Sequence, residues 1–492
     1  MPRSRWTLLA STAVAFGLSL GALTPSTAVT ASASVPSGPE DPAYTARDTQ
    51  NVADAYGRIT GPGGQLRNPS YLAALATEIP ATSLAQLLTQ VASPNRLAVT
   101  PGQFFPGWNV GNPLRADWAG TRGRVRAVAF TNRFGALLRG HVYAPLPGAR
   151  DPYTGKRLRG PFPGVVLTEG SVQGSEGMYE WLAQDLAERG YVVLTYDVQG
   201  QGTSETLPHD GGPVDALPFC NPFVEPQDGE MSGCPGVPSQ QLSNFVVGTE
   251  DALSFFTATP QRNYRLAEAG SDKVNPFWRL YDRSRDRRTE TPGRTQRIAV
   301  IGHSLGAAAV SQVQSTDRRV AVVVALDKLA GGTDTTPVVP ALAVQSEYGF
   351  TVSPWQLSGG SSLAPQPSPA GPDPRRERAT GFDAWDQAGV DSLLVVPRAS
   401  THLDYTDVPL VLPASRYGQD LTSVYVQRWL DRYLKHRSVK PLLATSMRYL
   451  EPTGDGEWSP VRLQRDRLLS FYYCSAYTLG SRTDGDLTNV GC

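Results

Sequence analysis

The chain has 492 residues, enough for one large domain or two to three ordinary ones. Hydrophobic residues make up 40% and charged residues 18%, so the composition excludes a disordered polymer. Lys and Arg together number 45, as do Asp and Glu, and this balance excludes nucleic acid or an anionic membrane as a partner attracted by overall charge. We therefore expect a neutral small molecule or polymer as the partner.

The first residues have the layout of a secretory signal. Arg3 and Arg5 precede an apolar run from Trp6 to Leu23, and small residues follow at 31–33. A basic end, a short apolar core and a small-residue peptidase site are typical of exported chains. We expect residues 1–33 to be a signal peptide and the mature protein to be secreted into the extracellular space, without a stable membrane anchor.

Residues 34–122 are polar and punctuated by Pro and Gly. Helix-like stretches occur at Tyr71–Glu78 and Leu84–Val91, and none of this segment shows a chemical motif. We expect an N-terminal extension that packs on the main domain.

Residues 123–440 show the pattern of an α/β domain. Apolar residues alternate on both sides of 132–135, which predicts a β-hairpin. Short apolar runs, alternating with helical stretches, then predict parallel strands buried on both faces. These runs are Val165–Leu167, Tyr191–Thr195, Ile298–Ile301, Val320–Leu326, Ala341–Val344 and Ser392–Val396. We expect a mostly parallel, doubly wound sheet, with its ligand site at the carboxyl ends of the strands.

Three insertions interrupt this alternation, at residues 203–240, 260–296 and 353–375. The first two lie between the same pair of predicted strands and are candidates for a lid or lateral lobe. The third is rich in Pro, Ser and Gly, which is typical of a long surface loop. Residues 441–492 are expected to form a C-terminal tail.

The chain contains four cysteines, Cys220, Cys234, Cys474 and Cys492. In an oxidising compartment an even number indicates disulfides, and four cysteines allow three pairings. Local pairing, Cys220 with Cys234 and Cys474 with Cys492, has the lowest loop-closure entropy. The spacing lacks the close cysteine or histidine pairs of a zinc site, so we expect no metal.

The strongest chemical signal is the stretch Ile298–Gly306, an apolar strand that ends in G-x-S-x-G, followed by the Ala-rich segment Ala307–Gln314. A strand, a sharp turn and a helix in this order predict that Ser304 is a nucleophile raised above the sheet edge. The helix directs free N–H groups, including that of Leu305, at a developing oxyanion. His303 points away from the reacting group in such a turn, so we expect it to be structural.

With this motif the chain resembles the α/β-hydrolase superfamily over residues 124–437, and Gly-His-Ser-Leu-Gly is the form common among its esterases and lipases. Residues 197–204 are similar to the superfamily's D-x-R-G-x-G-x-S turn, with Gln199 in place of the Arg. The resemblance implies an α/β-hydrolase fold and a structural role for Asp197. The order of elements is also similar to the secreted dienelactone-hydrolase and polyester-hydrolase branch, too loosely to indicate a substrate.

The general base is expected after the last predicted strand and before a closing helix. Of the five histidines only His402 lies there, followed by the amphipathic stretch Leu421–Leu434. We therefore predict that His402 is the base. Structural roles are expected for His141, His209 and His436.

The chain order of serine, acid and histidine leaves residues 305–401 for the acid. Glu347 closely follows the predicted strand Ala341–Val344, where the superfamily most often keeps its acid, although the usual G-x-x-D spacing fits imperfectly. Asp327 ends the preceding strand, a position used by some lipases. We prefer Glu347 and keep Asp327 as the alternative.

The second oxyanion donor is expected in the loop after Val165–Leu167. This chain has Glu169 and Gly170 where the superfamily often has His-Gly. Because the donor is a backbone N–H, the change need not abolish the site, and we assign it to Ser171.

These residues together predict a serine hydrolase that cleaves a small-molecule or polymeric carboxylic ester through an acyl-enzyme. The mechanism requires no metal or organic cofactor. A secreted peptidase or amidase of the same fold is the alternative, although its exopeptidases often carry a further glycine where this chain has Ala307. A non-catalytic binding protein that keeps the fold is the third possibility.

Overall fold

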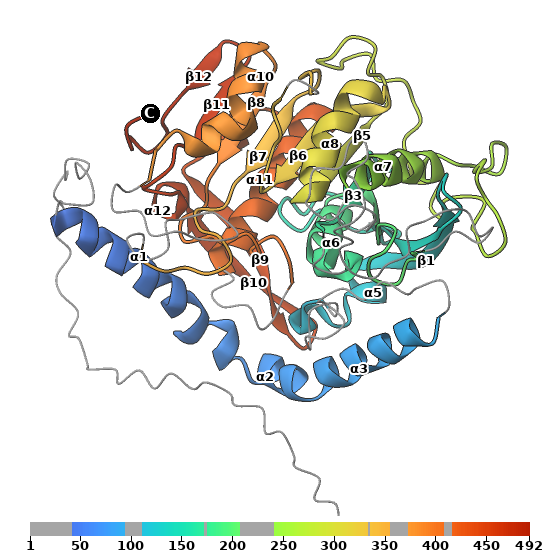
Figure 1. Cartoon of the computed structure of the whole chain (residues 1–492), viewed down its shortest axis with the longest axis horizontal. Helices are drawn as coiled ribbons and strands as arrows, with labels where there is room; N and C mark the ends of the chain where they lie inside the picture. The colour runs from blue at the N-terminus through green and yellow to red at the C-terminus, as the bar shows by residue number, and fades with distance from the viewer. Residues whose placement is uncertain are drawn as a thin grey trace, which may run out of the picture.

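A ten-stranded mixed sheet forms the centre of the molecule (Figure 1). Its strand order is β1-β2-β4-β3-β5-β6-β7-β8-β11-β12. The computed structural model describes residues 42–93, 111–171, 175–206, 241–332, 335–354, 372–407 and 416–492.

Strands β3 to β8 coincide with the six apolar runs of the sequence, and β1 and β2 form the predicted hairpin, whereas β11 and β12 lie in the segment expected to form a tail. The strands of the sheet are β1 (Gly123–Thr131), β2 (Leu137–Pro145), β3 (Gly164–Thr168), β4 (Val192–Tyr196), β5 (Ile298–His303), β6 (Val320–Leu326), β7 (Ala341–Val344), β8 (Ser392–Val395), β11 (Ala476–Leu479) and β12 (Arg482–Asp484). From β4 to β8 in the sheet order, each strand runs parallel to its neighbour. The hairpin β1-β2 and the pair β11-β12 close the two edges antiparallel. The prediction of an α/β fold with a mostly parallel sheet is therefore confirmed.

Both faces of the sheet are buried, as the continuous apolar strands require. Along β5, Ile298 and Val300 join one hydrophobic cluster, whereas Ala299 and Ile301 join the other. The first cluster includes side chains of α7 (Leu242–Phe256), α8 (Leu305–Thr316) and α10 (Asp383–Gln387). The second includes side chains of α6 (Glu180–Glu188) and α11 (Arg416–Leu434). Because β4 to β8 run parallel, their carboxyl ends lie together along one edge of the sheet.

The N-terminal extension forms helices along one side of the molecule, coloured blue in Figure 1. They are α1 (Pro42–Thr60), α2 (Pro69–Ala76) and α3 (Glu78–Val91), and the short α5 (Trp118–Thr121) precedes β1. Asn68 caps α2, where its side chain accepts hydrogen bonds from two backbone N–H groups. No helix in the described ranges is long and apolar enough to span a bilayer.

Residues 441–492 form more than a tail. A separate hairpin of β9 (Ser446–Gly454) and β10 (Glu457–Gln464) is followed by α12 (Arg465–Leu468). The chain then returns to pair β11 with β8 and so extends the main sheet. The predicted disulfide between Cys474 and Cys492 is confirmed, with Cα atoms 6.1 Å apart.

Several predicted features lie outside the described residues. These are the signal peptide 1–33, the Cys220–Cys234 pair, His209, and most of the insertions 203–240 and 353–375. The insertion 260–296 is described and packs along β1, where the backbone N–H of Asp272 donates to the carbonyl of Ala129. Its Leu280 carbonyl accepts from Phe162, just before β3.

Candidate active site

Ser304 lies in a strained turn between β5 and α8. Its φ of 54° and ψ of −118° are unusual for a residue with a side chain. A Cβ at Gly302 would lie 2.1 Å from the Gly306 carbonyl oxygen, and one at Gly306 would lie 2.2 Å from the carbonyl oxygen of Glu169. Both glycines are therefore required by close backbone contact, as the motif predicts.

The structure brings together Ser304, His402 and Asp327. Ser304 Oγ lies 3.1 Å from His402 Nε2, and His402 Nδ1 lies 2.5 Å from Asp327 Oδ2. The Ser304 backbone N–H donates to the carbonyl of Leu326, the last residue of β6, so Ser304 is tied to the strand that Asp327 directly follows. The three side chains form one continuous line at the carboxyl edge of the sheet.

The surroundings of Asp327 keep it ionised. The residue is 1% exposed and accepts hydrogen bonds from the backbone N–H of Ser346 at 3.1 Å and from its hydroxyl at 2.6 Å. Burial alone raises the pKa of Asp327, but the hydrogen bond and charge of His402 outweigh it and leave the pKa below its ordinary value. A carboxylate in this state can orient an imidazole and stabilise an imidazolium.

The preferred acid of the sequence analysis, Glu347, does not bond to His402, and this preference is corrected. Its carboxylate accepts from Asn51 Nδ2 at 2.8 Å, from Ser470 Oγ at 2.6 Å and from the Ala399 backbone N–H. The reason lies in the alternation of side chains after β7. Because the Ser346 side chain faces Asp327, the side chain of the next residue, Glu347, faces the opposite way, toward Asn51 of α1.

His303 is buried beside His402 and stays neutral. Its Nε2 lies 2.9 Å from the carbonyl oxygen of His402, which can only accept, so Nε2 carries the hydrogen. Nδ1 then accepts from the Tyr179 hydroxyl at 2.7 Å, and that hydroxyl oxygen accepts from the Gly170 N–H at 2.9 Å. Burial and the nearby His402 lower the pKa of His303 to about 3. His303 thus links the loop that carries His402 to the loop after β3.

The loop after β3 approaches Ser304 closely. A Cβ at Gly170 would lie 3.1 Å from the Ser304 Cβ, so Ser171, the next residue, lies at the same edge. Leu305 is the first residue of α8, where backbone N–H groups have no partner within the helix. The assignment of the Leu305 and Ser171 N–H groups as oxyanion donors stays a prediction.

Glu169 holds this loop in place through hydrogen bonds to residues that follow β4. It is buried, and one carboxyl oxygen accepts from the Val198 N–H and from Gln201 Nε2, each at 2.8 Å. Gln201 also donates to the Gly170 carbonyl at 2.9 Å. Burial, and then the charge of Asp197, raise the pKa of Glu169 well above its ordinary value.

The turn similar to D-x-R-G-x-G-x-S is held by hydrogen bonds. Asp197 accepts from the backbone N–H of Glu176 at 2.7 Å and from the N–H and hydroxyl of Thr203 at 2.6 and 2.8 Å. Gln199 accepts from Asn132 at 2.8 Å and donates to the Thr206 carbonyl at 2.8 Å. Gln199, which stands where the similar turn has an Arg, is therefore held by hydrogen bonds between neutral groups.

Two other histidines bond to carboxylates away from Ser304. His141 Nδ1 lies 2.6 Å from Glu176, which raises the pKa of His141 to about 9. His436 Nε2 lies 2.8 Å from Asp286 after the end of α11. Within the described ranges, no group of three or more His, Cys, Asp and Glu could hold a metal ion.

Sequence reasoning missed the contribution of α1 to the loop that carries His402. Arg398 Nε donates to Asn51 Oδ1 at 2.6 Å, and the guanidinium pairs with Asp54. Arg58 donates to the Arg398 carbonyl at 3.0 Å. The spacing of Asn51, Asp54 and Arg58 is that of one helical face, which was a sequence signal for a polar interface, although not for its partner.

No family model matches the chain, and no curated protein matches it. Among solved structures, a ferulic acid esterase from Streptomyces cinnamoneus is similar at 19% identity over 64% of this chain and 90% of that chain, with a TM-score of 0.38. A likeness at this TM-score indicates no activity for this chain.

Proposed function

We propose that the protein is a secreted serine hydrolase that cleaves carboxylic esters through an acyl-enzyme. The observation that carries the proposal is the continuous contact from Ser304 Oγ through His402 to Asp327, at 3.1 Å and 2.5 Å. A nucleophile, a base and an orienting carboxylate in this order are the arrangement that activates a serine hydroxyl. The strained turn at Ser304 supports the same role.

In acylation, His402 Nε2 takes the hydroxyl proton while Ser304 Oγ bonds to the ester carbonyl carbon. Asp327 stabilises the imidazolium that forms. The carbonyl oxygen gains negative charge and is stabilised by the N–H groups of Leu305 and Ser171. When the tetrahedral intermediate collapses, the bond to the alcohol breaks and His402 gives its proton to the leaving oxygen.

In deacylation, a water molecule takes the place of the alcohol. His402 removes one proton from this water, which attacks the acyl carbon, and the proton then returns to Ser304 Oγ as the carboxylic acid leaves. These steps use only the side chains and N–H groups of this chain, with a small-molecule or polymeric ester as the substrate.

Export is supported by the basic and apolar N-terminus and by the Cys474–Cys492 disulfide. Disulfides persist in oxidising compartments, and both features suit a protein that acts outside the cell.

The proposal is tested with p-nitrophenyl esters of increasing acyl length, comparing the wild-type protein with Ser304→Ala. We expect turnover by the wild type and a loss of at least about 10³-fold in the variant. The chain-length optimum separates an esterase from a lipase. Turnover of peptide p-nitroanilides in place of esters would move the proposal to a peptidase or amidase, and equal ester turnover by both proteins would refute it.

A further inference from the structure

A cavity lies at the end of the sheet opposite to Ser304. Its volume is about 760 Å³, and its walls include residues just before β3, β4 and β5, namely Pro163, Gly190 and Arg297. Parallel strands share one direction, so the starts of these strands lie at the edge away from the carboxyl ends. Residues of α11 complete the wall. The cavity is therefore separate from the candidate active site.

The lining of this cavity is strongly cationic. Two acids, Asp151 and Asp431, face nine basic side chains. The basic residues are Lys156, Arg157, Arg159, Arg189, Arg297, Arg428, Lys435, Arg437 and Arg448. The whole chain has a net charge of zero, so its balanced composition conceals this local excess.

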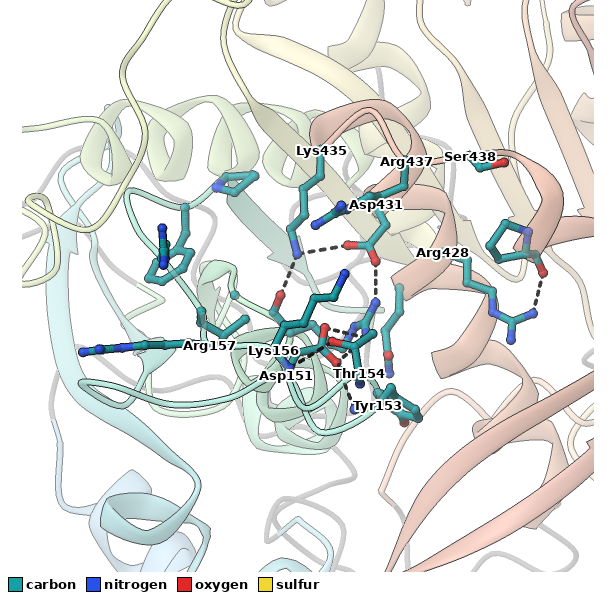
Figure 2. Close-up of a pocket in the computed structure, with 18 of the residues that line it drawn as sticks. Asp151, Tyr153, Thr154, Lys156, Arg157, Arg428, Asp431, Lys435, Arg437 and Ser438 are labelled. Carbon is teal, nitrogen blue, oxygen red and sulfur yellow. Dashed lines mark hydrogen bonds and ion pairs between the residues drawn. The ribbon is translucent and has the colours of Figure 1, made fainter.

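Both acids are already neutralised by neighbouring cations. Arg189 pairs with Asp151 at 2.8 Å and also with Asp431, which in turn lies 3.0 Å from Lys435 Nζ. Figure 2 shows Asp431 beside Lys435, with Asp151 below them, among the residues that line the cavity. Arg297 is matched separately, by Asp282 at 3.1 Å.

The remaining cations have no such partner. Within the part of the chain that the structure describes, no Asp or Glu forms an ion pair with any of the remaining six: Lys156, Arg157, Arg159, Arg428, Arg437 and Arg448. In Figure 2 the side chain of Arg157 lies on one side of the central pairs and that of Arg428 on the other. The unmatched charge therefore borders the cavity from two sides.

Lys435 is buried in the wall of this cavity. Burial, and then the charge of Arg189, outweigh the attraction of Asp431 and together lower the pKa of this ammonium group to about 8. Any anion that entered the cavity would favour the charged form of Lys435.

We propose that this cavity binds a polyvalent oxyanion, a ligand with two or more carboxylate or phosphate groups. Guanidinium groups donate paired N–H bonds that match the geometry of both oxyanions. The volume lies within the range of small-molecule sites, roughly 300–1,000 Å³. Several cations around one opening favour a ligand with several charges over a single monovalent ion. The site is separate from the ester that Ser304 would cleave, so it stands whether or not the proposed function holds.

The test is calorimetric titration of the full chain at about 0.15 M salt, where exposed charges are well screened. Citrate probes carboxylates and tripolyphosphate probes phosphates. We expect one site per chain for at least one probe. In the triple variant with Arg157, Arg159 and Arg437 each changed to Gln, we expect affinity to fall at least about tenfold, because several charge-assisted hydrogen bonds are lost. All three side chains are exposed, so the variant should fold.

A matched control removes the same charge elsewhere. Arg126, Arg467 and Arg482 are exposed on β1, α12 and β12, and changing all three to Gln should leave affinity within about twofold. Binding of citrate alone identifies a carboxylate ligand, and binding of tripolyphosphate alone a phosphate ligand. Absence of binding by both probes, or equal losses in both triple variants, would overturn the proposal.

Discussion

Replacement of Asp327 by Asn tests the correction of the triad acid. Both oxygens of Asp327 accept hydrogen bonds from Ser346, so an amide of the same shape can remain in place. If the amide oxygen keeps the bond to the Ser346 N–H, the NH₂ group faces His402 Nδ1. The imidazole must then carry its hydrogen on Nε2, the nitrogen that has to accept the Ser304 proton.

The expected loss of kcat is large because the contact between His402 and Asp327 is short and buried. His402 Nδ1 lies 2.5 Å from Asp327 Oδ2, and Asp327 is 1% exposed, so the imidazolium would lose a charge-assisted hydrogen bond screened by no water. In serine proteases, the same change from carboxylate to amide lowers kcat about 10⁴-fold. We expect Asp327→Asn to lower kcat by a similar factor, about 5 kcal/mol of transition-state stabilisation.

The assay compares kcat for a p-nitrophenyl ester between Asp327→Asn and Glu347→Gln. Glu347 bonds to Asn51, Ala399 and Ser470, so its amide variant is the matched control and should keep kcat within about tenfold. A far-ultraviolet spectrum and a melting curve establish that both variants fold. A large loss of kcat in Glu347→Gln together with near-normal activity in Asp327→Asn would refute the assignment.

Three further predictions concern stability. Burial lowers the pKa of His303 from the ordinary 6.5 to about 3, so as the pH falls the unfolded chain binds this proton before the folded chain does. The free energy of unfolding should therefore decrease as the pH falls from about 6.5 to about 3. His303→Gln should show a weaker dependence of this free energy on pH in urea unfolding, and an identical dependence would contradict the reasoning. Asn51→Ala removes a donor to the buried Glu347 and should cost about 1–3 kcal/mol in the free energy of unfolding, whereas an unchanged denaturation midpoint would show that the α1 contact contributes nothing. Cys492→Ser opens a link between positions 18 residues apart and should cost about 3 kcal/mol in the free energy of unfolding, and a reductant should destabilise the wild type by about that much more than the variant.

The sheet and the sharp turn at Ser304 could be predicted because their signals are local. A strand buried on both faces must be apolar throughout, and Ile298–Ile301 shows this before any contact is known. Ser304 needs two flanking glycines for close backbone contact, and these stand in the sequence. His402 followed from chain order alone.

The carboxylate that contacts His402 could not be predicted because the contact depends on which way a side chain faces after its strand. Asp327 and Glu347 both follow parallel strands at the correct edge, and only the orientation of Ser346 toward Asp327 decides between them. In the network from Gly170 through Tyr179 to His303, the bonded residues Tyr179 and His303 lie 124 positions apart in the sequence. Such contacts arise from packing and leave no local pattern.

The most direct test of the central claim is labelling of the active protein with a fluorophosphonate, followed by mass spectrometry of its peptides. We predict one adduct per chain, on the peptide that carries Ser304, and its loss in Ser304→Ala. An unlabelled protein, or an adduct on another residue that persists in Ser304→Ala, would contradict it.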